Sequence, residues 1–68
     1  MKTFGKRLKE VRVAKGMTQR QLAEVLNVSS NTVHCWETDK QEPSLSTVLF
    51  LSDYFDVSLD YLFGKSDY

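Results

Sequence analysis

Hydrophobic residues recur at helical spacing from the start of the chain. Phe4, Leu8 and Val11 follow an i, i+4, i+7 pattern, which places them on one face of a helix. The sequence has no sustained alternation of hydrophobic and polar residues and no Asn-Gly turn, so nothing in it predicts a strand or a hairpin. We therefore expect an all-α fold, with a first helix over residues 3–15 that ends near Gly16.

A repeated pattern indicates further helix starts. In it, a hydrophobic residue directly precedes a Ser or Thr, and a second hydrophobic residue lies four positions after that Ser or Thr. The hydroxyl can cap the new helix while the two hydrophobic residues pack on each other. The pattern occurs as Met17–Thr18–Leu22, Val28–Ser29–Val33 and Val57–Ser58–Leu62. Ser44 is another candidate cap, and Gln21 completes a capping box with Thr18. These patterns predict helices over residues 19–26, 30–38, 45–55 and 59–63.

The connection between the second and third predicted helices is short. It consists of Asn27, Val28 and Ser29, and Asn tolerates the left-handed conformation that ends a helix in a sharp turn. A three-residue turn between two short helices is typical of a helix-turn-helix. We expect a single domain over residues 1–68, with the helix-turn-helix at 19–38 and its second, recognition helix at 30–38.

The same spacing predicts the core. A chain of this length buries only about 60% of the surface that its unfolded form exposes, so the core should be thin. The expected core residues are Phe4, Leu8, Val11, Leu22, Ala23, Leu26, Val28, Val33, Trp36, Leu45, Val48, Leu51, Phe55, Val57, Leu59 and Leu62.

Charge is distributed unevenly along a chain whose net charge is zero. Residues 1–20 hold seven basic residues and one acidic residue, a sum of +6, whereas residues 21–68 hold two basic and eight acidic residues, a sum of −6. This asymmetry allows a basic face that attracts nucleic acid. The alternative is a basic first helix that is simply solvated.

Composition excludes several classes of function. One Cys and one His form neither an internal disulfide nor a zinc site, and no apolar run is long enough to span a membrane. With no signal peptide visible, a cytoplasmic location is expected. The sequence has no Gly-rich phosphate loop or carboxylate pair, and adjacent His34 and Cys35 point about 100° apart on a helix, so we expect neither an enzyme nor a cofactor. Cys35 as a redox sensor is a weaker alternative to a small apolar side chain.

One face of the 30–38 helix carries short, uncharged polar groups. If Val33 and Trp36 are buried, the opposite face presents Ser30, Asn31, His34, Cys35 and Thr38. Short polar side chains let a helix sit deep in the major groove, where Asn can pair with adenine and Ser or Thr can reach several base edges. We interpret this face as base-reading, although Ser29 alone is better explained as a helix cap.

The chain resembles the Xre-type helix-turn-helix family of phage repressor and Cro-like proteins. The resemblance rests on MTQRQLAEVLNVSSNTVHCWE, the downstream P-S-L and FDVSLDYLFG. It implies a five-helix, lambda-repressor-like domain that binds double-stranded DNA sequence-specifically. It further implies a transcriptional regulator, typically a prokaryotic or phage repressor, that binds its operator as a homodimer.

The resemblance also assigns roles to individual residues. The base-reading positions are Ser29, Ser30, Asn31, His34 and Cys35. The phosphate-binding positions, in which nearby basic residues are included, are Thr18, Gln19, Arg20, Thr38, Lys40 and Arg7. Arg12 and Glu37 match an ion pair that joins the first helix to the third; the alternative is two unrelated surface charges. The family often has Gly at the positions of Asn27 and Asp39, and a negative charge at residue 39 should weaken DNA binding.

The sequence indicates two kinds of protein partner, a second copy of the chain and another regulator. Apolar residues near the C-terminal end suggest a dimer interface formed by Leu49, Phe50, Tyr54, Tyr61 and Phe63, although some of them would instead cover the thin core. The competing function is a protein-interaction modulator, or anti-repressor, that keeps the fold but binds another regulator. It is favoured by the zero net charge, by Asp39 and by the absence of Lys or Arg from the recognition face.

Overall fold

Five helices form the regular structure of residues 2–67, the part of the chain that the computed structural model describes. They are α1 (Lys2–Ala14), α2 (Gln19–Leu26), α3 (Ser30–Glu37), α4 (Leu45–Phe55) and α5 (Leu59–Leu62). No strand occurs within this range, so the predicted all-α, five-helix fold is confirmed. The observed helix ends differ from the predicted ones by no more than one residue.

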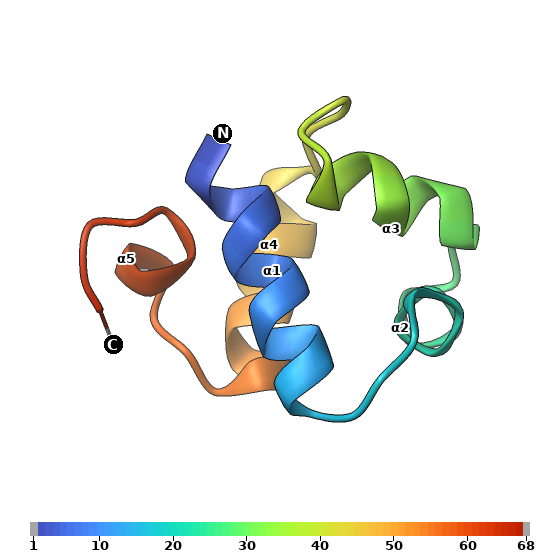
Figure 1. Ribbon diagram of the computed structural model, residues 1–68, viewed down its shortest axis with the longest axis horizontal. Coiled ribbons are helices and arrows are strands. Elements are labelled where there is room, and N and C mark those ends of the chain that lie inside the picture. Colours follow the sequence, from blue (N-terminus) through green and yellow to red (C-terminus); the bar gives the residue numbers. More distant parts are fainter. Residues whose placement is uncertain (1, 68) are drawn as a thin grey trace.

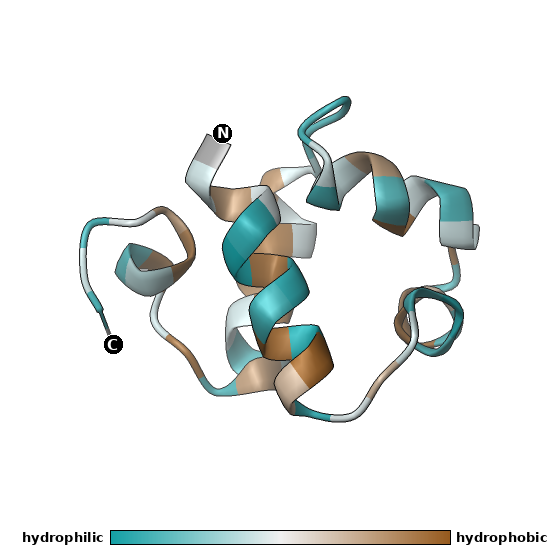
Figure 2. Ribbon diagram, in the orientation of Figure 1, coloured by the Kyte–Doolittle hydropathy of each residue, from teal (hydrophilic) through white to brown (hydrophobic). Residues whose placement is uncertain are grey.

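The helices pack around α1. Both α3 and α5 contact α1, α4 contacts α5, and α2 packs on α3. Figure 1 shows α1 in front of α4, with α2 and α3 on one side and α5 on the other. Hydrophobic and hydrophilic segments alternate along α1 in Figure 2, as expected of a helix that is buried on one side.

Side-chain caps start four of the helices. The hydroxyls of Thr18, Ser29, Ser44 and Ser58 each accept a hydrogen bond from the backbone N–H three residues later. At α2 the capping box is complete, because the Gln21 side chain also accepts from the Thr18 N–H at 2.8 Å. These bonds satisfy N–H groups that have no partner within the helix, and they confirm all four predicted starts.

Left-handed residues end α2 and α4. Asn27 has a φ of 57° and Asp56 a φ of 54°, and each donates its N–H to carbonyls of the last turn. Short polar side chains tolerate this conformation better than other non-glycine residues. Asn27 thereby sets the sharp reversal into α3.

The core is small and draws on α1 to α5. Its buried side chains are Phe4, Leu8, Leu22, Ala23, Val33, Trp36, Val48, Leu51 and Leu62. Val11, Leu26, Phe55, Val57 and Leu59 are half-buried against it.

Two expected core residues are exposed. Leu45 is 72% exposed and Val28 is 36% exposed, so both core predictions were wrong. Leu45 begins α4 on the side it shares with exposed Leu49, four residues on, rather than on the side of buried Val48. Val28 lies in the turn between α2 and α3, which leaves it partly uncovered.

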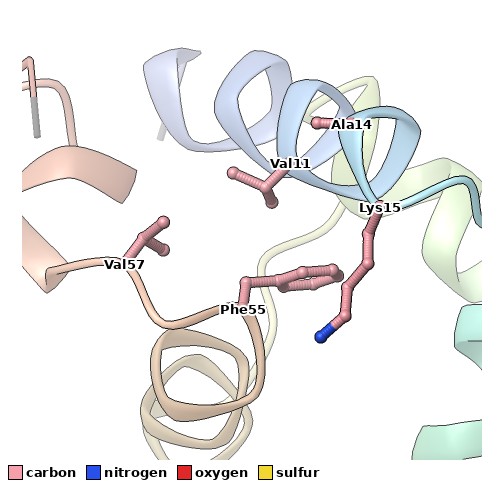
Figure 3. Close-up of a pocket in the computed structure, with 5 residues that line it drawn as sticks. All are labelled: Val11, Ala14, Lys15, Phe55 and Val57. Atoms are coloured by element: carbon pink, nitrogen blue, oxygen red, sulfur yellow. The ribbon is translucent and has the colours of Figure 1, made fainter.

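The thin core leaves an open hollow between the end of α1 and the α4–α5 junction. Val11, Ala14, Lys15, Phe55 and Val57 line it, and the stem of Lys15 passes beside the Phe55 ring (Figure 3). The Lys15 ammonium lies 4.4 Å from the centre of the Tyr54 ring. None of the helices described here is long and apolar enough to cross a membrane.

Candidate nucleic-acid interface

Helix α3, the predicted recognition helix, is buried on one side and polar on the other, as the sequence predicted. Val33 and Trp36 are buried, at 0% and 6% exposure, and hold α3 against the core. Ser30, Asn31 and His34 are exposed on the other side. The structure therefore brings these three predicted base-reading side chains together on one accessible face, with half-buried Cys35 at its edge.

Two predicted DNA contacts already make hydrogen bonds within α3. The Ser29 hydroxyl accepts from the Thr32 N–H at 3.1 Å and lies 2.9 Å from the Thr32 hydroxyl. The Thr38 hydroxyl donates to the His34 carbonyl at 2.9 Å. The Ser29 hydroxyl therefore caps α3. This is the role that the sequence analysis favoured for Ser29 when that residue was considered by itself.

The N-terminus of α2 lies beside α3. Thr18 caps it, Gln19 is its first helical residue, and Arg20 is exposed next to them. A helix N-terminus presents unpaired N–H groups and a positive dipole end, which favour a phosphate. At the other end of α3, exposed Lys40 lies in the loop that projects from the molecule in Figure 1.

A buried ion pair joins α1 to α3. The Arg12 Nε donates to Glu37 Oε2 at 2.6 Å and its Nη2 donates to Glu37 Oε1 at 3.1 Å. The side chains are only 9% and 2% exposed. Arg12 Nη1 also donates to the Met17 carbonyl at 2.6 Å, so the guanidinium ties α1, α3 and the segment before α2 together.

Gln19 extends this ion pair towards the exposed face of α3. Its Nε2 donates to Glu37 Oε1 at 3.0 Å and lies 3.5 Å from His34 Nδ1. The resemblance assigned Gln19 to phosphate binding, and the sequence gave no sign that its side chain reaches Glu37 and His34. That link depends on how α2 and α3 cross, which residue types alone do not fix.

Arg7 is placed apart from the other predicted phosphate-binding residues. Its guanidinium carbon lies 4.3 Å from the centre of the Tyr61 ring, on α5, and its Nη2 lies 3.7 Å from Asp67. Since α5 packs on α1 on the side away from α3 (Figure 1), the structure does not bring Arg7 to the α2–α3 face.

Residue 39 follows α3 in a left-handed conformation, with a φ of 62°. This conformation suits Gly, the residue that the resemblance implies here, since Gly adopts it without strain. Asp39 is exposed and adds a negative charge at the C-terminal end of α3.

The five predicted interface residues make different contacts. Leu49, Phe50 and Phe63 are exposed, at 46%, 43% and 37%. Phe50 stacks on Tyr54 at a centroid distance of 5.7 Å, and Tyr54 also contacts Phe55. Phe63 instead packs on Phe4 of α1 at 5.7 Å. Tyr54, Tyr61 and Phe63 thus partly cover the core, whereas Leu49 and Phe50 face outward.

Gly5 is a packing position beside the site that the sequence analysis missed. A Cβ at residue 5 would lie 2.6 Å from the Glu37 carbonyl oxygen and 2.7 Å from that of Trp36. Only a residue without a Cβ lets α1 approach the end of α3 this closely. A Gly within a predicted helix, near its start, was the available signal, because Gly is unfavourable in a helix without a packing reason.

Two short helices joined by a tight turn, with the second helix held by the core and polar on its outer face, define the helix-turn-helix class. The family model described as helix-turn-helix matches residues 8–62 of this chain. The chain therefore belongs to this family, which is Xre-like, as the sequence resemblance indicated.

The chain is also similar to individual helix-turn-helix regulators and to a solved structure. The transcriptional regulator ImmR of Bacillus subtilis is 45% identical over 65 residues, which are 96% of this chain and 51% of ImmR. The transcriptional activator BcrR of Enterococcus faecalis is 37% identical over 94% of this chain and 31% of its own length. The restriction-modification controller protein C.AhdI from Aeromonas hydrophila superposes with a TM-score of 0.77 at 33% identity, covering 90% of this chain and 92% of that one.

These relatives are transcriptional regulators and a controller protein by name, not enzymes, as the sequence analysis expected of this chain. The chain spans about half the length of ImmR and less of BcrR.

Proposed function

We propose that this chain is a sequence-specific, double-stranded DNA-binding regulator of transcription, and that α3 enters the major groove. The exposed, uncharged polar face of α3, with the N-terminus of α2 beside it, is the observation that carries the proposal. Asn31 suits bidentate pairing with adenine, and Ser30 can reach several base edges. The family membership and the names of the relatives support the same function.

Backbone contacts would fix the position of α3 in the groove. We assign the phosphates to the capped start of α2, with Thr18, the backbone N–H of Gln19 and Arg20, and to Lys40 at the other end of α3, where the Thr38 hydroxyl would exchange its bond to the His34 carbonyl for one to a phosphate. These contacts position a protein on the duplex without reading its sequence. Because one short helix reads few base pairs, we further propose a homodimer that reads two half-sites about 34 Å apart, as an operator-binding repressor does.

Selection of bound duplexes from a random library tests binding, specificity and symmetry together. We expect an inverted repeat whose half-sites are one helical turn apart. Asn31→Ala should change the base preference at one position of each half-site. The expected loss of discrimination against the wrong bases there is about 1–3 kcal/mol. Lys40→Ala should weaken all duplexes alike and flatten the salt dependence by about one unit of slope. A wild-type chain that enriches no duplex refutes the proposal.

Two features favour a second candidate function, a module that binds another regulator protein instead of DNA. The outer face of α3 carries no Lys or Arg, and Asp39 places a negative charge beside it. Most non-specific DNA affinity comes from Lys and Arg contacts to phosphates. A salt titration with random duplex separates the two functions: binding that strengthens as salt falls supports DNA, and no binding at low salt supports the protein partner.

A further inference from the structure

A line of four side chains connects the buried ion pair to the exposed face of α3. Arg12 donates to both oxygens of Glu37, Gln19 Nε2 donates to Glu37 Oε1, and the same Nε2 lies 3.5 Å from His34 Nδ1. Three of the four are buried or half-buried, and His34 is exposed. The interior is therefore linked to a base-reading position by direct contacts.

The chemistry of these contacts fixes which way the Gln19 amide points. A carboxylate paired with a guanidinium can only accept hydrogen bonds, so the NH₂ end of the amide must face Glu37. The second hydrogen of that NH₂ is then available to His34 Nδ1. A nitrogen that accepts a hydrogen bond carries no proton, so the proton of the neutral imidazole lies on Nε2.

We infer that Gln19 holds His34 as the Nε2–H tautomer, which makes His34 a specificity-determining residue that donates to an acceptor on a base edge. The inference rests on the proposed function, which it makes more specific. Guanine N7 and O6, adenine N7 and thymine O4 are acceptors in the major groove, whereas the polar group of cytosine there is the N4 amino donor. His34 thus discriminates against cytosine at the position it faces, and Gln19 is its positioning residue.

The tautomer is measured without DNA. Nitrogen-15 chemical shifts of the His34 ring, recorded on the whole chain in mildly alkaline buffer, report which nitrogen carries the proton. We expect Nε2–H to dominate in the wild type and Gln19→Leu to shift the ring towards the mixture seen for free imidazole. Gln21→Leu removes a glutamine two positions on, which bonds to Thr18 and not to His34, and should leave the ratio unchanged. An Nδ1–H tautomer in the wild type, or equal ratios in the wild type and Gln19→Leu, overturns the inference.

Base preference is measured by selection from the random library. We expect cytosine to be depleted about tenfold at one position of each half-site. The depletion should vanish in His34→Leu, diminish in Gln19→Leu and persist in Gln21→Leu, with the other positions unchanged. Free occurrence of cytosine there, or an unaltered profile in His34→Leu, contradicts base reading by His34. A wild-type chain that recovers no duplex refutes the proposed function itself, and base reading with it, whatever tautomer the spectra show.

Discussion

At the scale of single residues, Glu37 accepts three hydrogen bonds within the site. Both its oxygens accept hydrogen bonds, from Arg12 on α1 and Gln19 on α2, and its side chain is 2% exposed. A buried charge is tolerated only when its partners are in place. No buried side-chain nitrogen or oxygen among the described residues lacks a hydrogen-bond partner. Removal of one partner therefore leaves a buried polar atom without a hydrogen bond, which lowers the stability of the fold.

Arg12→Ala should lower the free energy of unfolding by about 3–5 kcal/mol, because it leaves the Glu37 carboxylate buried without its guanidinium. Urea denaturation followed by circular dichroism measures the change. The double variant Arg12→Met, Glu37→Leu removes both charges and should lose less stability than Arg12→Ala alone. An unfolding midpoint that Arg12→Ala leaves unchanged would show that the pair does not hold α1 to α3.

Asp39 concerns binding rather than stability. Asp39→Gly should raise the affinity for duplex DNA by on the order of 1 kcal/mol at low salt, because it removes a like charge near the phosphates. Asp39→Asn keeps a side chain that tolerates a positive φ and should give a similar gain, which separates charge from backbone. Fluorescence anisotropy at two salt concentrations measures both. Equal affinities for the wild type and Asp39→Asn would place residue 39 away from the DNA.

At the scale of elements, each helix start was predictable and the distances between helices were not. Thr18, Ser29, Ser44 and Ser58 act within one turn of their own helix, so the sequence alone identifies them. The contact of Gly5 with the end of α3 joins segments far apart in the chain, and its geometry depends on the packing of the whole core.

Gly5→Ala should destabilise the fold by about 1–3 kcal/mol, although Ala is the better helix former by about 1 kcal/mol. The added Cβ meets carbonyl oxygens of Trp36 and Glu37, which are backbone atoms and cannot move aside cheaply. Lys6→Ala, at the exposed neighbouring residue of α1, is the control and should change stability little. A thermal midpoint for Gly5→Ala at or above that of the control would contradict the close approach.

At the scale of the whole molecule, α4 presents an apolar face that is exposed. Leu45 and Leu49 lie one helical turn apart, and Phe50 is next to them. The sequence analysis predicted Leu49 and Phe50 as interface residues, but it assigned Leu45 to the core. A hydrophobic residue type does not show which side of a helix the other helices cover. The aromatic residues Tyr61 and Phe63 contact α1 instead, a result of where α5 packs.

Leu49→Glu should convert the proposed dimer to monomer, because it places a charge in the centre of this apolar face. Sedimentation velocity with and without operator DNA measures the change, and operator affinity should fall with it. Val13→Glu alters an exposed apolar residue of α1 instead and should leave the dimer intact. A wild-type chain that sediments only as monomer in both conditions would remove the homodimer from the proposal.

The separation between the two sides of α3 has a consequence for how such proteins diversify. Val33, Trp36 and Glu37 anchor the helix, whereas Ser30 and Asn31 contribute almost nothing to the interior. Under the proposed function, substitutions at the outward positions would therefore alter target choice at little energetic expense to folding. The proposal then implies that single substitutions on this scaffold would give new operator preferences, and residues 30 and 31 are the first positions to exchange.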